Sequence, residues 1–192
     1  MIEQALKLLR QGGLVAVPTD TVYGVICDAS NPKAVEKMYA MKARPTGQPF
    51  QVLVNSMEMA ESLAQLNESA TNITQKYWPG PLTLILPIQA NKIIDYAVCG
   101  NRYTVGLRWP KHELISQLID QLGSPLAASS VNMAGEMPRT TADAIREEFP
   151  HLHLIEGETG SAGSTIAELK ENKLIMYREG VISEAQLTKL LS

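Results

Sequence analysis

The sequence predicts an α/β protein in which helices alternate with the strands of a sheet. Apolar residues recur at helical spacing in separate segments, such as 2–9 and 114–122. Between them lie short continuous apolar runs, such as 14–17 and 82–86, which are typical of strands covered on both faces. No repeat or linker interrupts this alternation, so we expect residues 1–192 to form a single domain.

Helices are expected where an apolar stripe coincides with a start or stop signal. Gly12 and Gly13 end the first helix, while Asn31 caps the second and Pro32 takes its first position. Gly123 ends a central helix, and Ser183 with Gln186 forms a capping box before the last one. The expected helices are 2–11, 32–41, 57–63, 69–78, 114–122, 142–149 and 184–191.

Strands are expected at the apolar runs that lie between these helices. Two of them deliver an arginine at their end, Arg108 after 103–107 and Arg178 after 173–177. The stretch 89–101 has no clear period and is expected to be less ordered. The expected strands are 14–17, 22–26, 51–54, 82–86, 103–108, 125–132, 165–169 and 173–177.

Composition excludes several broad classes of protein. Hydrophobic residues make up 45% and charged residues 19%, as in ordinary globular chains, and the net charge of −3 argues against a broad basic surface for nucleic acid. Cys27 and Cys99 lie far apart without a CxxC pair and are expected to be reduced thiols, with a single disulfide as the alternative. There is neither a signal peptide nor a membrane-spanning run. We therefore expect a cytoplasmic protein.

A positively charged segment follows the second expected helix. Pro45 restricts Arg44 to an extended conformation, and in an extended chain residues two apart project to the same side. Lys42 and Arg44 would then present two cations together, which suits a phosphate or a carboxylate. The alternative is that both cations complement the end of the helix and face water.

Polar residues also gather where other strands begin or end. In open α/β sheets this edge is where ligands bind. Because the set combines cations and hydroxyls without a cluster of metal ligands, it favours a ligand rich in negative charge, either a nucleotide or a phosphorylated metabolite. The set consists of Thr21, Arg44, Arg108, Ser130, Asn132, Ser164 and Arg178.

Two further patterns carry less weight. His151 and His153 share a face of the chain, but two histidines without a third ligand rarely form a metal site. The glycine-rich stretch 157–165 lacks the lysine that a Walker A loop needs to reach the phosphates. A glycine-rich turn that presents Ser164 remains compatible with the sequence.

Seven short motifs occur in a fixed order along the chain. They are PTDTVYG at 18–24, KARP at 42–45, PGPLT at 79–83, GLRWPKH at 106–112, SVNMAG at 130–135, GSTI at 163–166 and REG at 178–180. Together they cover nearly the whole chain and resemble the YrdC/TsaC family of threonylcarbamoyl-AMP synthases. Longer members carry an extra C-terminal domain, which we do not expect here because the chain ends too soon for one.

The resemblance implies a fold and a reaction. The fold would be a twisted sheet, part parallel and part antiparallel, with flanking helices around a positively charged cavity. L-threonine and bicarbonate or CO2 would form a carbamate that attacks the α-phosphate of ATP and releases pyrophosphate. Downstream proteins would transfer the threonylcarbamoyl group to tRNA. A direct contact of this chain with tRNA or double-stranded RNA is also expected.

The resemblance also implies roles for individual residues. The catalytic set would be Lys42, Arg44, Ser130 and Asn132; the threonine-binding set Thr21, Arg108, Ala128 and Ser164; and the ATP-binding set Arg44, Gln48, Thr104, Ser130 and Arg178. Mg²⁺ would arrive with ATP, held by phosphates and water, with no dedicated protein metal site and no organic cofactor.

Three positions depart from the family pattern. Ala134 replaces the second serine of SxNxSG, Pro138 stands where many relatives have a serine near ATP, and Leu53 occupies a position that is histidine in some members. Two other functions stay open: a paralogue with different carbamoyl chemistry, as in hydrogenase-maturation proteins, and a module that only binds RNA. The second is disfavoured by the net charge and by the hydroxyls around the cations.

Overall fold

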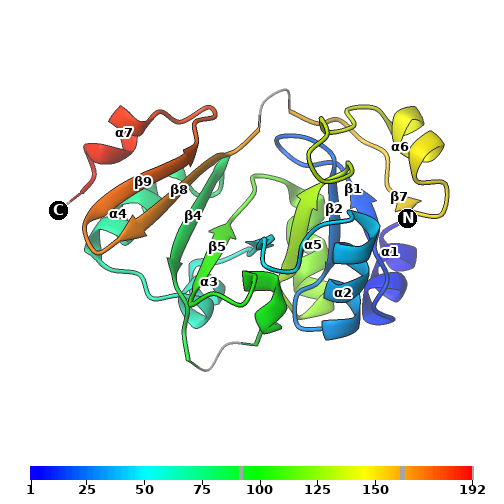
Figure 1. Cartoon of the computed structure of the whole chain (residues 1–192), viewed down its shortest axis with the longest axis horizontal. Helices are drawn as coiled ribbons and strands as arrows, with labels where there is room; N and C mark the ends of the chain where they lie inside the picture. The colour runs from blue at the N-terminus through cyan, green and yellow to red at the C-terminus, as the bar shows by residue number, and fades with distance from the viewer. Residues whose placement is uncertain (91–92, 161–162, 192) are drawn as a thin grey trace.

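The computed structural model describes residues 1–90, 93–160 and 163–191. Its nine-stranded sheet has the order β7-β1-β2-β6-β3-β5-β4-β8-β9 (Figure 1). The strands are β1 (Val15–Val17), β2 (Gly24–Asp28), β3 (Gln51–Leu53), β4 (Leu82–Pro87), β5 (Thr104–Arg108), β6 (Leu126–Ser130), β7 (His153–Leu154), β8 (Thr165–Lys170) and β9 (Lys173–Arg178).

Seven α-helices and a short 3₁₀ helix are found in the described part of the chain. They are α1 (Ile2–Arg10), α2 (Pro32–Met41), α3 (Met57–Leu63), α4 (Glu68–Tyr77), η1 (Tyr96–Cys99), α5 (Glu113–Leu122), α6 (Ala142–Glu148) and α7 (Glu184–Thr188). Within the described ranges, none of these helices has the length and apolar character needed to cross a bilayer.

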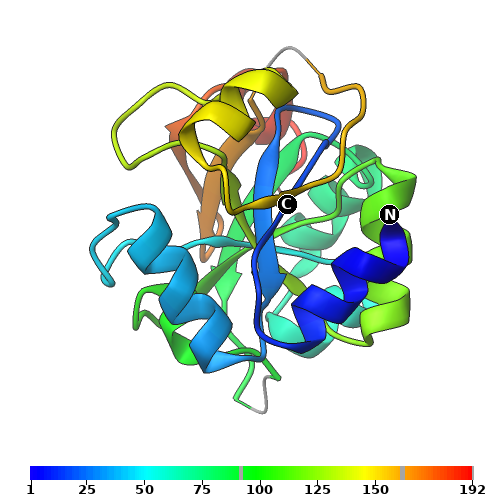
Figure 2. The ribbon, with the colours of Figure 1, turned by 90° about the vertical axis from the view of Figure 1, so that its right-hand side faces the viewer.

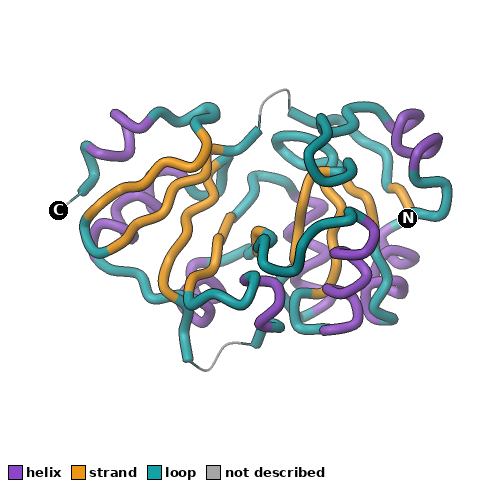
Figure 3. The backbone as a smooth tube through the Cα atoms, viewed as in Figure 1, coloured by secondary structure: helices purple, strands orange, loops and turns teal. Residues whose placement is uncertain are grey.

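The sheet mixes parallel and antiparallel pairs. β1 with β7, β3 with β5, and β4 with β8 are parallel, and the remaining neighbours are antiparallel. The strands, drawn in orange in Figure 3, change their tilt across the sheet, whose edge strands are β7 and β9. The predicted α/β class and the mixed sheet are thereby confirmed.

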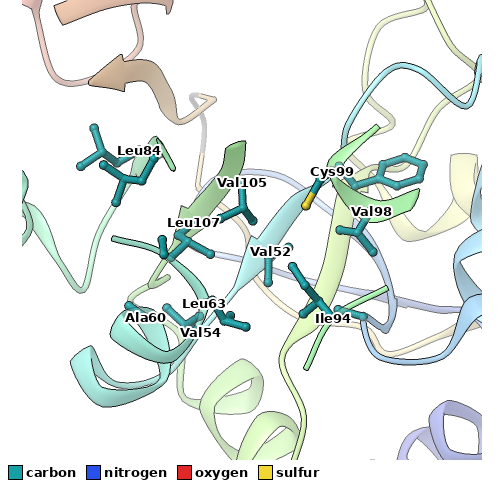
Figure 4. Close-up of a cluster of buried hydrophobic side chains, with 14 of the residues drawn as sticks. Val52, Val54, Ala60, Leu63, Leu84, Ile94, Val98, Cys99, Val105 and Leu107 are labelled. Carbon is teal, nitrogen blue, oxygen red and sulfur yellow. The ribbon is translucent and has the colours of Figure 1, made fainter. Parts of the chain in front are cut away.

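One face of the sheet is covered along its length. Helices α2, α3, α4 and η1 pack there against apolar residues of the central strands in the largest hydrophobic cluster. Figure 4 shows part of it, where Val52 and Leu107 of β3 and β5 meet Leu63 of α3. This continuous core holds the central strands as a rigid base.

The other face is covered only in part. Helices α1 and α5 pack against β1, β2, β6 and the end of β3 in a second cluster that includes Leu53. Figure 2 shows α1 and α2 on opposite sides of the sheet at this end. No helix lies in front of β4, β8 and β9 in Figure 1, where α4 lies behind them. This second face is therefore open beyond β3.

Several expected boundaries differ from the structure. β2 begins at Gly24 instead of 22, because the preceding threonines bond to one another and to the Val22 carbonyl in a bend. α7 ends at Thr188, short of the expected 191. β7 was not expected, since a two-residue strand carries no readable period. The stretch 89–101, expected to be less ordered, contains η1, whose Val98 and Cys99 are buried in the largest hydrophobic cluster. The other differences lie at element ends or in a very short element.

Substitution of two glycines with left-handed backbones, Gly100 and Gly123, tests how tightly the segment around Gly47 packs against the end of η1. A Cβ at Gly100 (φ +61°) would lie 2.7 Å from the Gly47 carbonyl oxygen, whereas one at Gly123 (φ +73°) would meet nothing within 4 Å. We expect Gly123→Ala to lose about 1–2 kcal/mol of unfolding free energy from backbone strain alone. Gly100→Ala should lose about 1–3 kcal/mol more from overpacking. Urea titration of both variants measures the difference, and equal losses would contradict the close packing.

Candidate functional site

A cavity of about 440 Å³ lies on the open face of the sheet, beside the region covered by α1 and α5. Seven of the residues given a catalytic or binding role from the sequence line it: Thr21, Arg44, Arg108, Ala128, Ser130, Ser164 and Arg178. Four others, Lys42, Gln48, Thr104 and Asn132, are not among its lining residues. The remaining walls come from Val22, Pro49, Phe50, Gln51, Ser129, Met137, Pro138, Thr140, Gly163 and Ile166.

The cavity lies across a sheet face and not along one edge. β6 is antiparallel to β3, which is parallel to β5, so Ser130 and Arg108 end their strands at opposite edges. Both nevertheless line the cavity, because Ala128 and Ser130 project from the same face of β6 as Arg108 does from β5. The expectation of a common edge was therefore wrong, since that rule applies to parallel strands.

The two residues before Arg44 are not extended, so the expectation that Lys42 and Arg44 project together to one side was wrong. Lys42 is helical and Ala43 is left-handed (φ 47°), while the Arg44 amide bonds back to the Tyr39 carbonyl at 3.0 Å. This turn ends α2 in the manner of a helix C-terminal motif. Two carbonyls then fix the Arg44 guanidinium: Nε donates to Gln48 at 3.2 Å and Nη2 to Pro49 at 2.8 Å.

Lys42 points away from water, with only 1% of its surface exposed. Its Nζ donates to the carbonyl oxygens of Ser130 and Asn132, both at 2.7 Å, and to Asn132 Oδ1 at 3.0 Å. Burial, followed by the charge of Arg44, lowers the pKa of Lys42 to about 8. The ammonium group therefore joins the end of α2 to the end of β6.

Ser130 and Asn132 form a pair, as their spacing suggested. Ser130 Oγ donates to Asn132 Oδ1 at 2.7 Å, and Asn132 Nδ2 donates to the Glu136 carbonyl at 2.7 Å. Asn132 is buried and Ser130 is partly exposed in the cavity wall. The amide thus lies behind the hydroxyl and supports it.

Arg108 is held by the PTDT segment. Its Nη2 contacts Asp20 Oδ1 at 2.6 Å, and its Nη1 donates to Thr21 Oγ1 at 3.0 Å. Burial lowers the pKa of Arg108, and Asp20 opposes that shift. The guanidinium has five N–H groups, and these two bonds together with the long contact from Nε to Gly80 use three. Among the described residues, one N–H on each terminal nitrogen has no partner and can donate to a ligand.

Arg178 reaches the same cavity from the end of β9. Its Nε donates to the Ser164 carbonyl at 2.8 Å and its Nη2 to Ser164 Oγ at 3.0 Å. Burial and then the charge of Arg108 lower the pKa of Arg178. Since the described lining residues include three arginines and no carboxylate, an anion in the cavity would relieve this repulsion.

Gln48 and Thr104 lie near the cavity without lining it. The Gln48 carbonyl accepts from Tyr39 Oη at 2.9 Å as well as from Arg44. Thr104 begins β5 at the edge where β6 ends, since Gly106 and Ala128 both pair with Gln51. Both residues therefore lie on the Arg44 and Ser130 side.

The sequence reasoning missed residues that belong to the site. Gln51 lines the cavity, and Asp20 pairs with Arg108 behind it. Met137 and Thr140 lie on a loop held by Arg139, which forms ion pairs with Glu136 and Glu148. The loop also brings the noted departure Pro138 into the wall. Asp20 could have been found from its place inside PTDT, but no local signal marks the loop.

Metal ligands do not converge in the described part of the chain. No group of three or more His, Cys, Asp or Glu residues there is placed to hold an ion. His153 begins β7, and its Nε2 is buried without a partner, while His151 lies in the preceding turn. The described wall residues of the cavity include no carboxylate.

Comparison with known proteins gives a consistent result. The curated threonylcarbamoyl-AMP synthase of Pyrococcus abyssi is 33% identical over 195 residues, which cover 99% of this chain and 57% of the relative. That of Photobacterium profundum is 32% identical over 164 residues, 83% of this chain and 88% of the relative. The crystal structure of P. abyssi Sua5 complexed with L-threonine superposes with a TM-score of 0.91 at 32% identity, covering 99% of this chain and 57% of that one.

The chain thus spans little more than half the length of its P. abyssi relative. The family model of Sua5, YciO and YrdC proteins, described as telomere recombination, matches residues 7–180. That range includes the seven motifs and every described residue that lines the cavity. The chain belongs to the Sua5/YciO/YrdC family.

Proposed function

We propose that this protein is a threonylcarbamoyl-AMP synthase, a nucleotidyltransferase that forms threonylcarbamoyl-AMP and pyrophosphate from L-threonine, bicarbonate or CO2, and ATP. The observation that carries this proposal is the convergence of Arg44, Arg108 and Arg178 on one cavity. These three cations match the two anionic partners of the reaction, a nucleoside triphosphate and an amino-acid carboxylate. The names of the relatives support the same reaction.

Arg108 is the group best suited to hold the threonine carboxylate. Its two remaining N–H groups, one on each terminal nitrogen, allow a bidentate pair with a carboxylate. Asp20 and Thr21 fix the plane of the guanidinium, so little conformational entropy is lost when the ligand binds. Thr21, Ser164 and the backbone at Ala128 complete this subsite.

The phosphates of ATP are assigned to the side of Arg44, Ser130 and Arg178. Arg44 is immobilised by two carbonyls, so its charge is oriented before any phosphate arrives. Gln48 and Thr104 lie on the same side and are assigned to the nucleotide. Lys42 and Asn132 act behind Ser130 in this proposal, as positioning residues that keep its hydroxyl in place.

The chemistry needs charge stabilisation and alignment. An oxygen of the carbamate attacks the α-phosphorus of ATP, a new P–O bond forms, and pyrophosphate leaves with the electrons of the broken P–O bond. Fixed guanidinium groups stabilise the developing negative charge without reorganisation. Bringing the two substrates together contributes up to about 7–11 kcal/mol in well-aligned reactions. Mg²⁺ bound to ATP would add charge neutralisation, held by phosphates and water.

The product would be consumed by an acyl transfer. A mixed anhydride between a carbamate and a phosphate is an activated acyl donor, so the next reaction transfers the threonylcarbamoyl group to a nucleophile. We assign that nucleophile to an adenosine of tRNA, reached through separate transfer proteins. Direct contact of this chain with tRNA or double-stranded RNA belongs to the same proposal, as does a cytoplasmic location.

Pyrophosphate release tests the proposal. With ATP and Mg²⁺, we expect release only when L-threonine and bicarbonate are both present. Arg44→Gln removes a fixed cation and should lower kcat/KM by about 10²–10³. Arg102→Gln is the matched control. Arg102 is exposed, contacts the Gly47 carbonyl in the loop that follows Arg44, and is not among the lining residues. Release that needs neither threonine nor bicarbonate would refute the assignment.

The pKa of Lys42 predicts a pH dependence of stability. The folded protein releases this proton near pH 8, whereas an unfolded lysine holds it to about pH 10.4. Between these values the unfolded state binds more protons, so the unfolding free energy should rise with pH; below pH 8 both states are charged and the contribution is flat. Urea titrations of wild type and Lys42→Met from pH 7 to 10.5 measure the difference.

Subtracting the unfolding free energy of Lys42→Met from that of wild type at each pH isolates the contribution of Lys42. Burial raises the pKa of the Cys27 thiol, so at alkaline pH the unfolded state loses this proton first and the unfolding free energy falls. This effect is the same in wild type and in Lys42→Met. A difference that stays constant with pH would mean that the three oxygens around Nζ keep the ammonium charged. The ¹³Cε resonance of Lys42 in labelled wild-type protein gives an independent reading of the same pKa.

A further inference from the structure

A chain of side-chain hydrogen bonds lies under the cavity floor. Arg178 Nη2 is 3.0 Å from Ser164 Oγ, which is 3.3 Å from Thr83 Oγ1, which is 3.0 Å from Gln51 Oε1. Thr83 and Ser164 are each only 2% exposed. Ser164 and Gln51 line the cavity, while Thr83 is not among its lining residues and lies between them. The roles proposed above use neither Thr83 nor Gln51.

The sheet is built to allow this contact. Gln51 belongs to β3 and Thr83 to β4, which lie on either side of β5 and are therefore about 9–10 Å apart. Gly106 of β5 pairs with Gln51 and carries no side chain to separate the two. A Cβ there would already touch Thr83 Cγ2 at 3.4 Å, so a larger group would crowd the bond.

The groups at the two ends of this series fix the donor and the acceptor of each hydrogen bond in it. A guanidinium only donates, and an amide oxygen only accepts. Thr83 therefore gives its proton to Gln51 Oε1, and Ser164 must give its own to Thr83 while it accepts from Arg178. The remaining lone pair of Ser164 is all that its hydroxyl offers to a ligand. Ser164 is thus an acceptor.

The hydroxyl of Thr21 can also act only as an acceptor toward a ligand, for a similar reason. Thr19 Oγ1 donates to the Val22 carbonyl at 2.7 Å, so Thr21 must donate to Thr19 across their 3.0 Å contact. Thr21 Oγ1 accepts from Arg108 Nη1. It too retains one lone pair. The cavity consequently pairs two accepting hydroxyls with donating groups of Arg108 and of the Gln51 amide.

We propose that Thr83 and Gln51 determine amino-acid specificity by holding Ser164 as an acceptor for the side-chain hydroxyl of the substrate. This inference rests on the proposed function. Because the carboxylate and the amine share one carbon, a carboxylate on Arg108 brings the amine beside Thr21, which lies 3.0 Å from Arg108 Nη1. Ser164 is then left for the hydroxyl on the next carbon.

This arrangement selects against an isostere without the hydroxyl. L-valine has a methyl group where L-threonine has its hydroxyl, so it would leave the Ser164 lone pair unpaired in a buried site. Sites built to bond a substrate hydroxyl reject such analogues far more strongly than apolar pockets do. If Thr83 did not take the Ser164 proton, the hydroxyl of Ser164 would be free to turn and the penalty would fall.

Calorimetric titration with L-threonine and L-valine tests the proposal. Wild type should bind valine at least about 100-fold more weakly than threonine. Thr83→Val is isosteric and removes the proton acceptor for Ser164, so we expect this ratio to fall about tenfold. Thr83→Ser restores the hydroxyl and should restore the ratio. A merely structural role of Thr83 would weaken both ligands alike and leave the ratio unchanged.

Gln51 gives a second, independent pair of variants. Gln51→Glu keeps an accepting oxygen for Thr83, so the ratio should stay near that of wild type, although repulsion of the ligand carboxylate weakens both ligands. Gln51→Met removes the acceptor at similar size, so the ratio should fall as in Thr83→Val. This pair also serves if Thr83→Val does not fold, which circular dichroism will show.

The outcomes separate the two proposals. If wild type shows threonine-dependent pyrophosphate release and binds threonine, but Thr83→Val and Gln51→Met keep its threonine-to-valine ratio, this inference is overturned and the proposed function stands. If wild type neither binds threonine nor releases pyrophosphate with it, both fail. A reduced ratio in Thr83→Val and Gln51→Met, with recovery in Thr83→Ser and Gln51→Glu, supports the inference.

Discussion

The architecture of the site depends on one buried ammonium group. Lys42 follows directly on the end of α2, and its Nζ lies 2.7 Å from the carbonyl oxygen of Ser130, which ends β6. The three oxygens around Nζ tie these ends together and place Asn132 behind the Ser130 hydroxyl. A buried charge is costly unless its donors are satisfied, so this arrangement tolerates little displacement. The turn that follows α2 places Arg44 against Pro49, in the segment that leads into β3.

A second constraint is the incomplete cover of the sheet. The α1 and α5 layer ends beside β3, and the open face beyond it receives the loops that carry Thr21, Ser164 and Pro138. Because the sheet is mixed, groups from strand ends at opposite edges meet above its middle. Gly106 has no side chain, so nothing projects from β5 into the space between Gln51 and Thr83. The cavity is thus a product of strand order as much as of its polar residues.

Preorganisation links these features to function. Each arginine in the described wall is already bonded to a carbonyl, a carboxylate or a hydroxyl, so its position is set before a ligand arrives. The hydroxyls are oriented in turn by bonds behind them. Such networks are costly to leave partly satisfied, which makes their polarity a property of the fold and not of the ligand. Proposed specificity and proposed catalysis therefore depend on the same buried bonds.

The sequence by itself determined the class of fold, most elements, and seven residues of the cavity wall. Local signals sufficed for the helices: Asn31 caps α2 and Gly123 ends α5 as their types require. Tertiary structure alone decided that Lys42 is buried, that Ser130 and Arg108 meet across a face, and that Gln51 reaches Thr83 over Gly106. These facts depend on strand order and register, which bring together residues far apart in the chain and which no local period encodes.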